Sequence, residues 1–435
     1  MITSKQMWGL VFLIFVAAVY LAVYYLHAKK PNNEPVEIYF ADRIAAAHSI
    51  LIEKYNELNA GKVKVIPIDF PNDDFSTNER KEVLARSLRG RGDGIDLFAV
   101  DVVWSQRFAK WSEPLDKYFT SEEKKRILDK ALYSCYYEGE LVAVPLFIVQ
   151  GIMYYRQDLI HNLKNGKEIE KKIKEFITWE DFIELSKQIQ LDNPYYIFHA
   201  ADYEGLICMY MEALLSLKPN YFEEIGFNFN TKEAEKALQL LVDIVHKYKI
   251  APKVVSNFTE VISYDYFIRN DGLFIRGWQS YDKDFVENMI DPVKEKNLRK
   301  APLPYFKGHK PASIFGGWNL MISKYSNKKE YVVDFIKFLL NDESQESLYK
   351  ESGYYPVLKS FYNDKKYFEK YPEMKYNVEL IKTGVHRPQH VEYTKYSKIM
   401  SHYFYKAIKN EISVKDALAK CTNAIQYDKL MTKDF

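Results

Sequence analysis

Cysteine, glycine and proline are scarce in this sequence, and neither sign of charge is in excess. Its 435 residues include 3 Cys, 17 Gly and 16 Pro, with 61 Lys+Arg against 59 Asp+Glu. Three cysteines do not make a disulfide framework, and so little glycine and proline excludes a collagen-like or long low-complexity chain. A net charge of +2 argues against a nucleic-acid partner. The length suits two or three globular domains.

Common catalytic and cofactor motifs are also missing. The sequence contains no G-x-x-x-x-G-K-[ST], no H-E-x-x-H, no C-x-x-C and no G-x-S-x-G. His386 and His390 have a metal-ligand spacing, but Pro388 between them argues against a shared helix. We therefore expect a binding protein with no cofactor and no metal, and not an enzyme. Any chain with 59 acidic residues can nevertheless bring two carboxylates together.

One long apolar run stands near the amino terminus. Residues 7–26 carry no charge and have aromatic residues at both ends, as in a helix that crosses a bilayer core of about 30 Å. A cleaved secretory signal has a shorter core and a small-x-small site, and Leu26 stands where a small residue is needed. We predict a transmembrane anchor over residues 1–30 and a linker over residues 31–35.

After the linker, strand and helix patterns alternate, which predicts an α/β fold with a parallel sheet. The expected elements are strands at 36–40, 63–70 and 95–103 and helices at 44–58 and 78–88. Ligands of such sheets bind at the carboxyl ends of strands. Residues at or near those ends are Asp42, Asp69, Asp101 and Trp104.

The pattern is more helical from Trp179 onward. Thr178 and Thr231 precede apolar stripes of helical spacing and are expected to cap helices. The chain is expected to return to the sheet near 267–278 and 312–323. Helices are expected at 179–188, 204–217, 232–248, 328–340, 342–350 and within 391–430.

Several short segments together resemble a known family pattern. They are Gly94–Trp104, Trp111–Asp116, Gly139–Pro145, Met153–Leu159, Thr178–Phe182, Ile275–Trp278, Gly316–Lys324, Arg387–Pro388 and Ile412–Leu418. In this order they resemble the family 1 extracellular solute-binding proteins of ABC importers, a group that includes maltose- and trehalose-binding proteins. The resemblance extends over residues 36–427.

The resemblance implies the two-lobe, type II periplasmic-binding-protein fold, with a ligand cleft between the lobes. Residues 36–145 and 319–352 would form lobe 1, and residues 146–318 and 353–435 would form lobe 2. The chain would cross between the lobes three times, and glycine makes the backbone changes of a hinge easy. The expected hinge residues are Pro145, Gly316, Gly317 and Gly353.

The resemblance and the chemistry of sugars together suggest a set of site residues. Aromatic rings cover the apolar faces of a sugar, and charged or amide groups bind its hydroxyls. The stacking candidates are Trp104, Tyr154, Trp278 and Trp318, and the polar candidates are Asp101, Gln150 and Arg387. Each aromatic residue could instead pack in a core.

Other residues near these motifs have simpler interpretations. Trp111 and Trp179 lie beside turns, where we expect core packing, and Asp96 is expected to have a structural role at its strand. Tyr354 and Tyr355 follow a hinge glycine and stay candidates for the cleft.

The function implied is a receptor at the cell membrane, with a single-pass anchor and an extracytoplasmic solute-binding region. It would capture a carbohydrate and deliver it to an ABC permease with separate ATPase subunits. Two alternatives stay open, namely a sensor with the same fold and an anchored carbohydrate-active enzyme, which would need a pair of carboxylates in the cleft.

Overall fold

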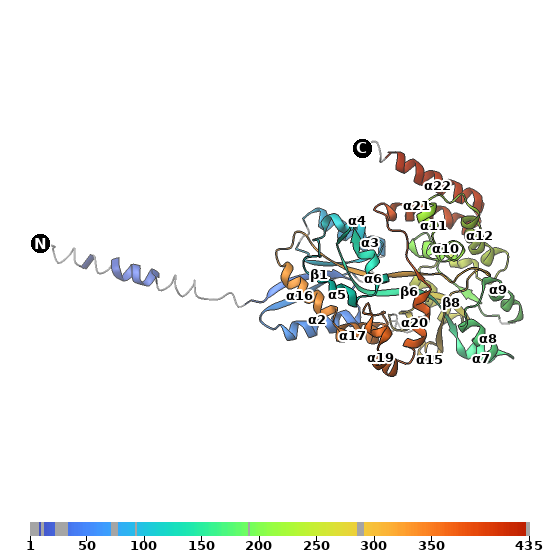
Figure 1. The fold of residues 1–435 in the computed structure, drawn as a ribbon, viewed down its shortest axis with the longest axis horizontal. Helices are drawn as coiled ribbons and strands as arrows, with labels where there is room; N and C mark the ends of the chain where they lie inside the picture. Colours follow the sequence, from blue (N-terminus) through green and yellow to red (C-terminus); the bar gives the residue numbers. More distant parts are fainter. Residues whose placement is uncertain are drawn as a thin grey trace.

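A computed structural model describes residues 8–9, 13–21, 34–70, 77–91, 94–189, 192–284 and 291–431 of the chain. Figure 1 shows an α/β body with β1, α2 and α16 at one end and α7, α8 and α9 at the other, and β6 runs between the two ends. We refer to these two ends as the first and the second lobe, and we assign the elements to them by the boundaries predicted from the sequence.

The first lobe holds the amino-terminal strands. Its strands are β1 (Val36–Asp42), β2 (Val63–Asp69), β3 (Leu97–Asp101), β4 (Tyr136–Tyr137) and β5 (Glu140–Leu141). Its helices are α2 (Ala46–Leu58), α3 (Thr77–Arg89), α4 (Ser105–Phe108), α5 (Ser121–Arg126), α6 (Asp129–Leu132), α16 (Lys329–Leu339) and α17 (Asp342–Ser352).

The second lobe is richer in helix. Its strands are β7 (Tyr196–Ile197), β8 (Phe274–Trp278), β9 (Leu298–Ala301) and β11 (Gly384–Val385). Helices of its central part are α7 (Gln157–His161), α8 (Gly166–Lys174), α9 (Trp179–Gln188), α10 (Glu204–Leu217), α11 (Tyr221–Glu224), α12 (Lys232–His246), α13 (Glu260–Arg269), α14 (Tyr281–Asp284) and α15 (Pro292–Glu295). The carboxyl-terminal helices are α18 (Ser360–Asn363), α19 (Lys365–Lys370), α20 (Met374–Lys382), α21 (Tyr393–Ile408) and α22 (Val414–Met431).

The main sheet has the strand order β2-β1-β3-β10-β6-β8-β7, with β11 beside β10 and β9 beside β6. Strand β1 is parallel to β2 and β3, as the alternating sequence pattern predicts. The sheet as a whole is mixed, because β10 (Ser313–Ile322) is antiparallel to both β3 and β6 (Val144–Arg156). Strand β10 enters the first lobe from the second, which a local pattern of strands and helices does not reveal.

The two longest strands, β6 and β10, pass from one lobe to the other. Early in β6, Val144 pairs with Leu320, and further along Gly151 pairs with Trp278 of β8. The β6–β10 register shifts between Trp318 and Asn319. One residue earlier, Gly317 has a φ of +130°, and an added Cβ would lie 2.4 Å from the Phe147 carbonyl oxygen. A side chain at this position would collide with the neighbouring strand.

The other expected hinge positions lie at the same crossing or near it. Pro145 pairs with Asn319, and Gly316 pairs with Val149. Gly353 ends α17 in the left-handed conformation, with a φ of +71°. Two residues later the chain lies against β6, where Tyr355 and Ile148 exchange both backbone hydrogen bonds. The hinge assignment and the lobe boundaries stay predictions.

Several local expectations are confirmed. Helices α9 and α10 begin and end at the predicted residues, and the Thr178 and Thr231 side chains accept hydrogen bonds from backbone N–H groups of the first turn. Trp111 and Trp179 are buried. The Asp96 carboxylate accepts a hydrogen bond from the Tyr39 backbone N–H at 3.0 Å. The Ser326 hydroxyl and the Lys328 ammonium also donate to it, so its role is structural.

The predicted membrane segment lies partly outside the described residues, because residues 7, 10–12 and 22–26 are among those not described. Residues 13–21 are helical and their side chains are exposed. Within the described part of the chain, no helix combines the length and the apolar character needed to cross a bilayer.

Candidate functional site

The end of β3 brings three of the predicted site residues together. Asp101 is directly opposite Trp318 in the antiparallel β3–β10 ladder. After Asp101 the chain turns, with a hydrogen bond of 2.8 Å from the Trp104 N–H to the Asp101 carbonyl. This turn ends β3 sooner than expected and brings the two indoles edge to face, with centroids 6.1 Å apart. Trp104 is buried, whereas Trp318 is partly exposed.

Arg387 meets this group from the segment between β11 and α21. Its Nη2 donates to Asp101 Oδ1 at 2.7 Å, and its Nη1 donates to Glu204 Oε1 at 2.8 Å. Glu204 is the first residue of α10, a favourable place for a negative charge. Its Oε1 also accepts a hydrogen bond of 2.6 Å from the Tyr393 hydroxyl. Arg387 therefore links a carboxylate of the first lobe to one of the second.

The charge state of this link follows from its surroundings. Burial raises the pKa of Asp101, and the nearby Arg387 opposes that rise. Burial also disfavours the charge of Arg387, but Asp101 and Glu204 outweigh it and hold the Arg387 pKa well above its ordinary value. Arg387 is therefore a permanent cation, and Asp101 and Glu204 compensate its buried charge.

Trp278 lies further along the same pair of strands. It ends β8, opposite Gly151 of β6, and is partly exposed. Its Cζ3 and Cη2 atoms are 3.4 and 3.5 Å from where a Cβ of Gly316 would lie. Gly316 is two residues before Trp318 in β10, so Trp278 lies beside the same crossing strand that carries Trp318 of the Trp104–Trp318 pair.

Two predicted site residues are enclosed by protein. Gln150 is fully buried, and its side-chain amide donates to the Leu380 carbonyl at 2.7 Å and to the Thr383 hydroxyl at 3.1 Å. Tyr154 is also fully buried, and its hydroxyl donates to the Gln279 carbonyl at 2.9 Å. These are the surroundings of core residues, and a role for either in ligand contact stays a prediction.

A second polar group, not selected from the sequence as a site, lies at the end of β1. The carboxylate Oδ2 of Asp42 is 4.0 Å from His48 Nε2. Both atoms are buried, and neither has a hydrogen-bond partner among the described residues. Burial raises the pKa of Asp42 to about 7, although the nearby Arg80 and Arg43 lower it. Burial and the charge of Arg43 both lower the pKa of His48, to about 4. The position of Asp42 at a strand end was the signal that could have identified this group.

Aromatic rings connect Asp42 and His48 to the segment after Gly353, where the chain returns to β6. The rings of Phe147 and Tyr354 are stacked with centroids 3.8 Å apart, and His48 lies about 6 Å from both. The Nη1 of Arg43 donates to the Tyr354 hydroxyl at 3.2 Å. Tyr354 thus lies at the junction of the two lobes, and the side chains of both Tyr354 and Tyr355 are buried.

Cations of α3 cover two of the indoles. The Arg80 guanidinium carbon is 4.9 Å from the Trp318 ring centroid, and the Lys81 ammonium is 5.8 Å from that of Trp104. Both side chains are buried. Charge balance comes from the strand ends, since Arg80 interacts with both Asp42 and Asp101. The junction therefore combines indole rings with charges of both signs.

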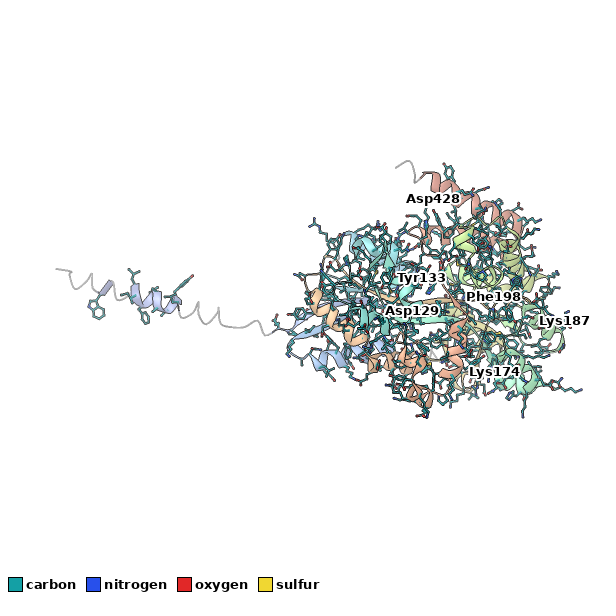
Figure 2. All side chains as sticks on the ribbon, in the orientation of Figure 1. Asp129, Tyr133, Lys174, Lys187, Phe198 and Asp428 are labelled. Carbon is teal, nitrogen blue, oxygen red and sulfur yellow. The ribbon has the colours of Figure 1, made fainter. Side chains whose placement is uncertain are left out.

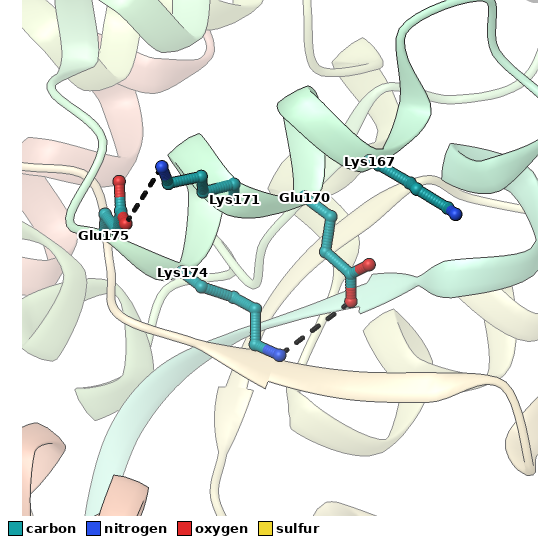
Figure 3. Close-up of a pocket in the computed structure, with 5 residues that line it drawn as sticks. All are labelled: Lys167, Glu170, Lys171, Lys174 and Glu175. Atoms are coloured by element: carbon teal, nitrogen blue, oxygen red, sulfur yellow. Dashed lines mark ion pairs between the residues drawn. The ribbon is translucent and has the colours of Figure 1, made fainter.

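Two surface hollows lie elsewhere. One, of about 360 Å³, is formed by charged side chains of α8 and the residue after it, among them the ion pairs Lys171–Glu175 and Lys174–Glu170 (Figure 3). The other, of about 220 Å³, lies between α9 and α12 and includes Trp179. Figure 2 shows Lys174 and Lys187 of the second lobe far from Tyr133, which contacts His386 beside Arg387. Neither hollow includes a predicted site residue.

The sequence over residues 39–346 matches the family model of the bacterial extracellular solute-binding proteins. The chain belongs to this family. A probable ABC transporter-binding protein of Deinococcus radiodurans is 25% identical over 350 residues, which cover 78% of this chain and 80% of that protein. The relationship therefore extends over most of both sequences.

Solved structures of such solute-binding proteins have the same fold. Maltose-bound MalE3 of T. maritima has a TM-score of 0.79 and 26% identity, covering 90% of this chain and 99% of that one. A cyclic α-maltosyl-1,6-maltose binding protein of Arthrobacter globiformis has a TM-score of 0.72 and 21% identity, covering 90% and 98%. The second likeness concerns the fold alone. The expected two-lobe α/β architecture of this solute-binding protein is thus confirmed.

Proposed function

We propose that this solute-binding protein captures a sugar between its two lobes and delivers it to an ABC permease. The observation that carries the proposal is the row of Trp104, Trp318 and Trp278 along the crossing strands, beside the Asp101–Arg387 ion pair. Indole faces suit the C–H faces of a sugar, and charged groups suit its hydroxyls. Among proteins of the same fold, T. maritima MalE3 has maltose bound.

Capture would follow from the arrangement of charged groups in the two lobes. A ligand that contacts both lobes favours the closed form over the open form, and only such differential contacts shift the balance. The Arg387–Asp101 hydrogen bond of 2.7 Å joins residues assigned to different lobes, so it would form only when the lobes meet. A sugar that contacts either of its charged groups would therefore be bound at the point where closure is completed.

Transport would need partner chains. The sequence has no nucleotide-hydrolysing motif, so the energy for import would come from separate ATPase subunits that associate with the permease. Residues 7–26 would keep the receptor at the extracytoplasmic face of the membrane beside that permease.

A thermal-shift screen tests the proposal. The purified soluble region, residues 34–435, is heated alone and with glucose, tagatose, maltose, maltotriose or a cyclic glucan, each at millimolar concentration. A ligand that binds only the folded state raises the melting temperature, so we expect at least one sugar to do so in a dose-dependent way. If no sugar in the panel raises it and an amino acid or a polyamine does, the sugar assignment is wrong.

The anchor has a separate test. Amino-terminal sequencing of the protein isolated from its native membrane should show the chain beginning at Met1 or the next residue. A chain that begins at or after His27 would show that the apolar segment is removed as a signal.

A further inference from the structure

Arg276 lies beneath the indole of Trp278. The two residues are two apart in β8, so their side chains share one face of the sheet. The Arg276 guanidinium carbon is 4.1 Å from the centroid of the Trp278 ring, and the Arg276 side chain is fully buried. The planar cation therefore lies against the indole on the protein side.

The orientation of Arg276 is fixed from several elements. Its Nη2 and Nε donate to the two carboxylate oxygens of Glu212 on α10, at 2.6 and 3.3 Å. Glu212 Oε1 in turn accepts a hydrogen bond of 3.3 Å from the backbone N–H of Ile314 on β10. The Nη1 of Arg276 is 3.3 Å from Nε2 of His199, whose pKa burial and Arg276 lower far below its ordinary value. A neutral ring can accept that hydrogen bond.

The backbone beside the pair leaves room for it. An added Cβ at Gly151 would lie 2.2 Å from Glu212 Oε1 and 2.5 Å from Arg276 Nη2. Gly151 is also the residue opposite Trp278 in the β6–β8 ladder. Any other residue at this position would displace the ion pair that supports the ring.

Stability alone does not account for such a pair. Burying two charges has a large desolvation cost, and well-packed apolar residues of similar size are often at least as stabilising. A guanidinium held at two points, in contrast, presents a flat surface of fixed orientation to an aromatic ring. Trp278 itself ends its strand and is partly exposed, and its side chain also donates a hydrogen bond to Glu260, so Arg276 would fix the face of a ring that is held at its edge.

We propose that the Arg276–Glu212 pair is a positioning device that fixes the Trp278 indole so that the ligand can stack on its other face. The stacking of a ligand on Trp278 rests on the proposed function, but the orientation of the ring by Arg276 does not require a ligand. Arg276 acts through Trp278 and does not itself contact the sugar.

The first experiment needs no ligand. The protein is labelled with 5-fluorotryptophan, and the ¹⁹F resonance of Trp278 is assigned as the one missing from Trp278→Phe. Arg276→Lys keeps the charge but loses the planar surface, so we expect it to shift or broaden that resonance. The matched control is Arg156→Lys, since Arg156 is another buried arginine with two carboxylate partners, five residues beyond Gly151 in β6. It should leave the Trp278 resonance in place.

Glu212→Gln provides a second variant, should Arg276→Lys fail to fold. It retains the shape of the side chain and should move the same resonance. A Trp278 signal that is unchanged in the folded variants would overturn the proposal.

The second experiment measures coupling through maltose affinity. Arg276→Lys should weaken maltose binding by about tenfold when Trp278 is present and have little effect in the Trp278→Ala background. The effects of substitutions at two residues in contact are not additive. An equal loss in both backgrounds would mean a general structural role and would overturn the proposal. If the wild-type protein binds no sugar, the proposed function fails, and the ¹⁹F spectra still decide whether the pair orients the ring.

Discussion

Arg276 and Arg387 are both buried arginines that pair with carboxylates, but one pair lies within a lobe and the other spans the junction. The predicted boundaries place α10 and β8 in one lobe, so we expect Arg276 and Glu212 to stay together when the lobes part. Arg387 meets Asp101 of the opposite lobe at 2.7 Å and keeps Glu204 of its own. The first arrangement suits a fixed surface, and the second suits a contact that forms and breaks.

The largest expected effect comes from removing the partner of the enclosed arginine. Glu212→Ala leaves Arg276 buried without a carboxylate, which should reduce the free energy of unfolding by about 3–5 kcal/mol. Asp101→Ala should cost less, about 1–2 kcal/mol, since Arg387 retains Glu204 and water can reach it when the lobes part. Urea unfolding of both variants measures the difference. Equal losses would contradict the distinction between the two pairs.

A second test concerns the backbone where the lobes join. Gly317→Ala should destabilise by about 3 kcal/mol, because the added Cβ would lie 2.4 Å from the Phe147 carbonyl oxygen in addition to the unfavourable φ. Gly226 is the matched control, since it has a φ of +70° and nothing within 4 Å of an added Cβ. Gly226→Ala should cost only about 1 kcal/mol. Thermal unfolding measures the loss of stability in both variants. Equal losses would mean that the strand crossing tolerates a side chain at Gly317.

A smaller effect is expected on the shape of the ligand-free protein. Asp101→Asn removes the charge that attracts Arg387 across the junction, so the open form should be more populated and the radius of gyration in solution X-ray scattering should increase. Asp271→Asn removes a carboxylate from Arg156 within the second lobe, where Asp158 remains. This control should leave the radius unchanged. An Asp101→Asn protein as compact as the wild type would show that the link does not influence closure.

The smallest expected effect is a pH dependence at the first-lobe side of the junction. Asp42 has a pKa of about 7 when folded and 3.8 ordinarily, so its contribution to stability falls as pH rises between those values. His48 has a pKa of about 4 when folded and 6.5 ordinarily, so its contribution rises with pH over nearly the same range. Arg43 and Arg80 face Asp42 from β1's end and α3, and Asp69 faces it from β2.

In the wild-type protein these two slopes largely cancel. Asp42→Asn should therefore give a stability that increases with pH between 4.5 and 6.5 relative to wild type, and His48→Gln should give the opposite trend. Urea unfolding at three pH values in this range measures both. Parallel profiles for the two variants would mean that neither group titrates as its burial implies.

Elements that depend on neighbours in sequence were predicted well. The apolar stripes of α9 and α10 and the threonines before α9 and α12 are local signals. They predicted both ends of α9 and α10 and the start of α12, which ends two residues earlier than expected. The insertion of β10 between β3 and β6 is a long-range pairing with no local signal. The sequence pattern predicted a return to the sheet near 312–323, and the family resemblance predicted crossings between the lobes, but neither gave this strand order.

The site was predictable only where its residues lie in local sequence patterns or in family motifs. Asp101 and Trp104 follow a recognisable strand, and Arg387 lies in a family motif, whereas His48 is one of several residues on the inner face of α2. Tyr154 shows a further limit. A family motif marks it as a stacking candidate, but whether its ring meets the core depends on packing against Tyr281 and Gln279.

Calorimetric titration with the sugar that gives the largest thermal shift tests the central claim most directly, with wild type, Trp104→Ala and Trp278→Ala compared side by side. Tyr427→Ala, which truncates an exposed aromatic ring on α22, serves as the control. Because the two indoles are assigned to different lobes, each truncation should weaken binding by about tenfold or more. The melting temperature without sugar should change little for Trp278→Ala and should fall for Trp104→Ala, since Trp104 is buried. Wild-type affinity in both variants would contradict a sugar held between the lobes.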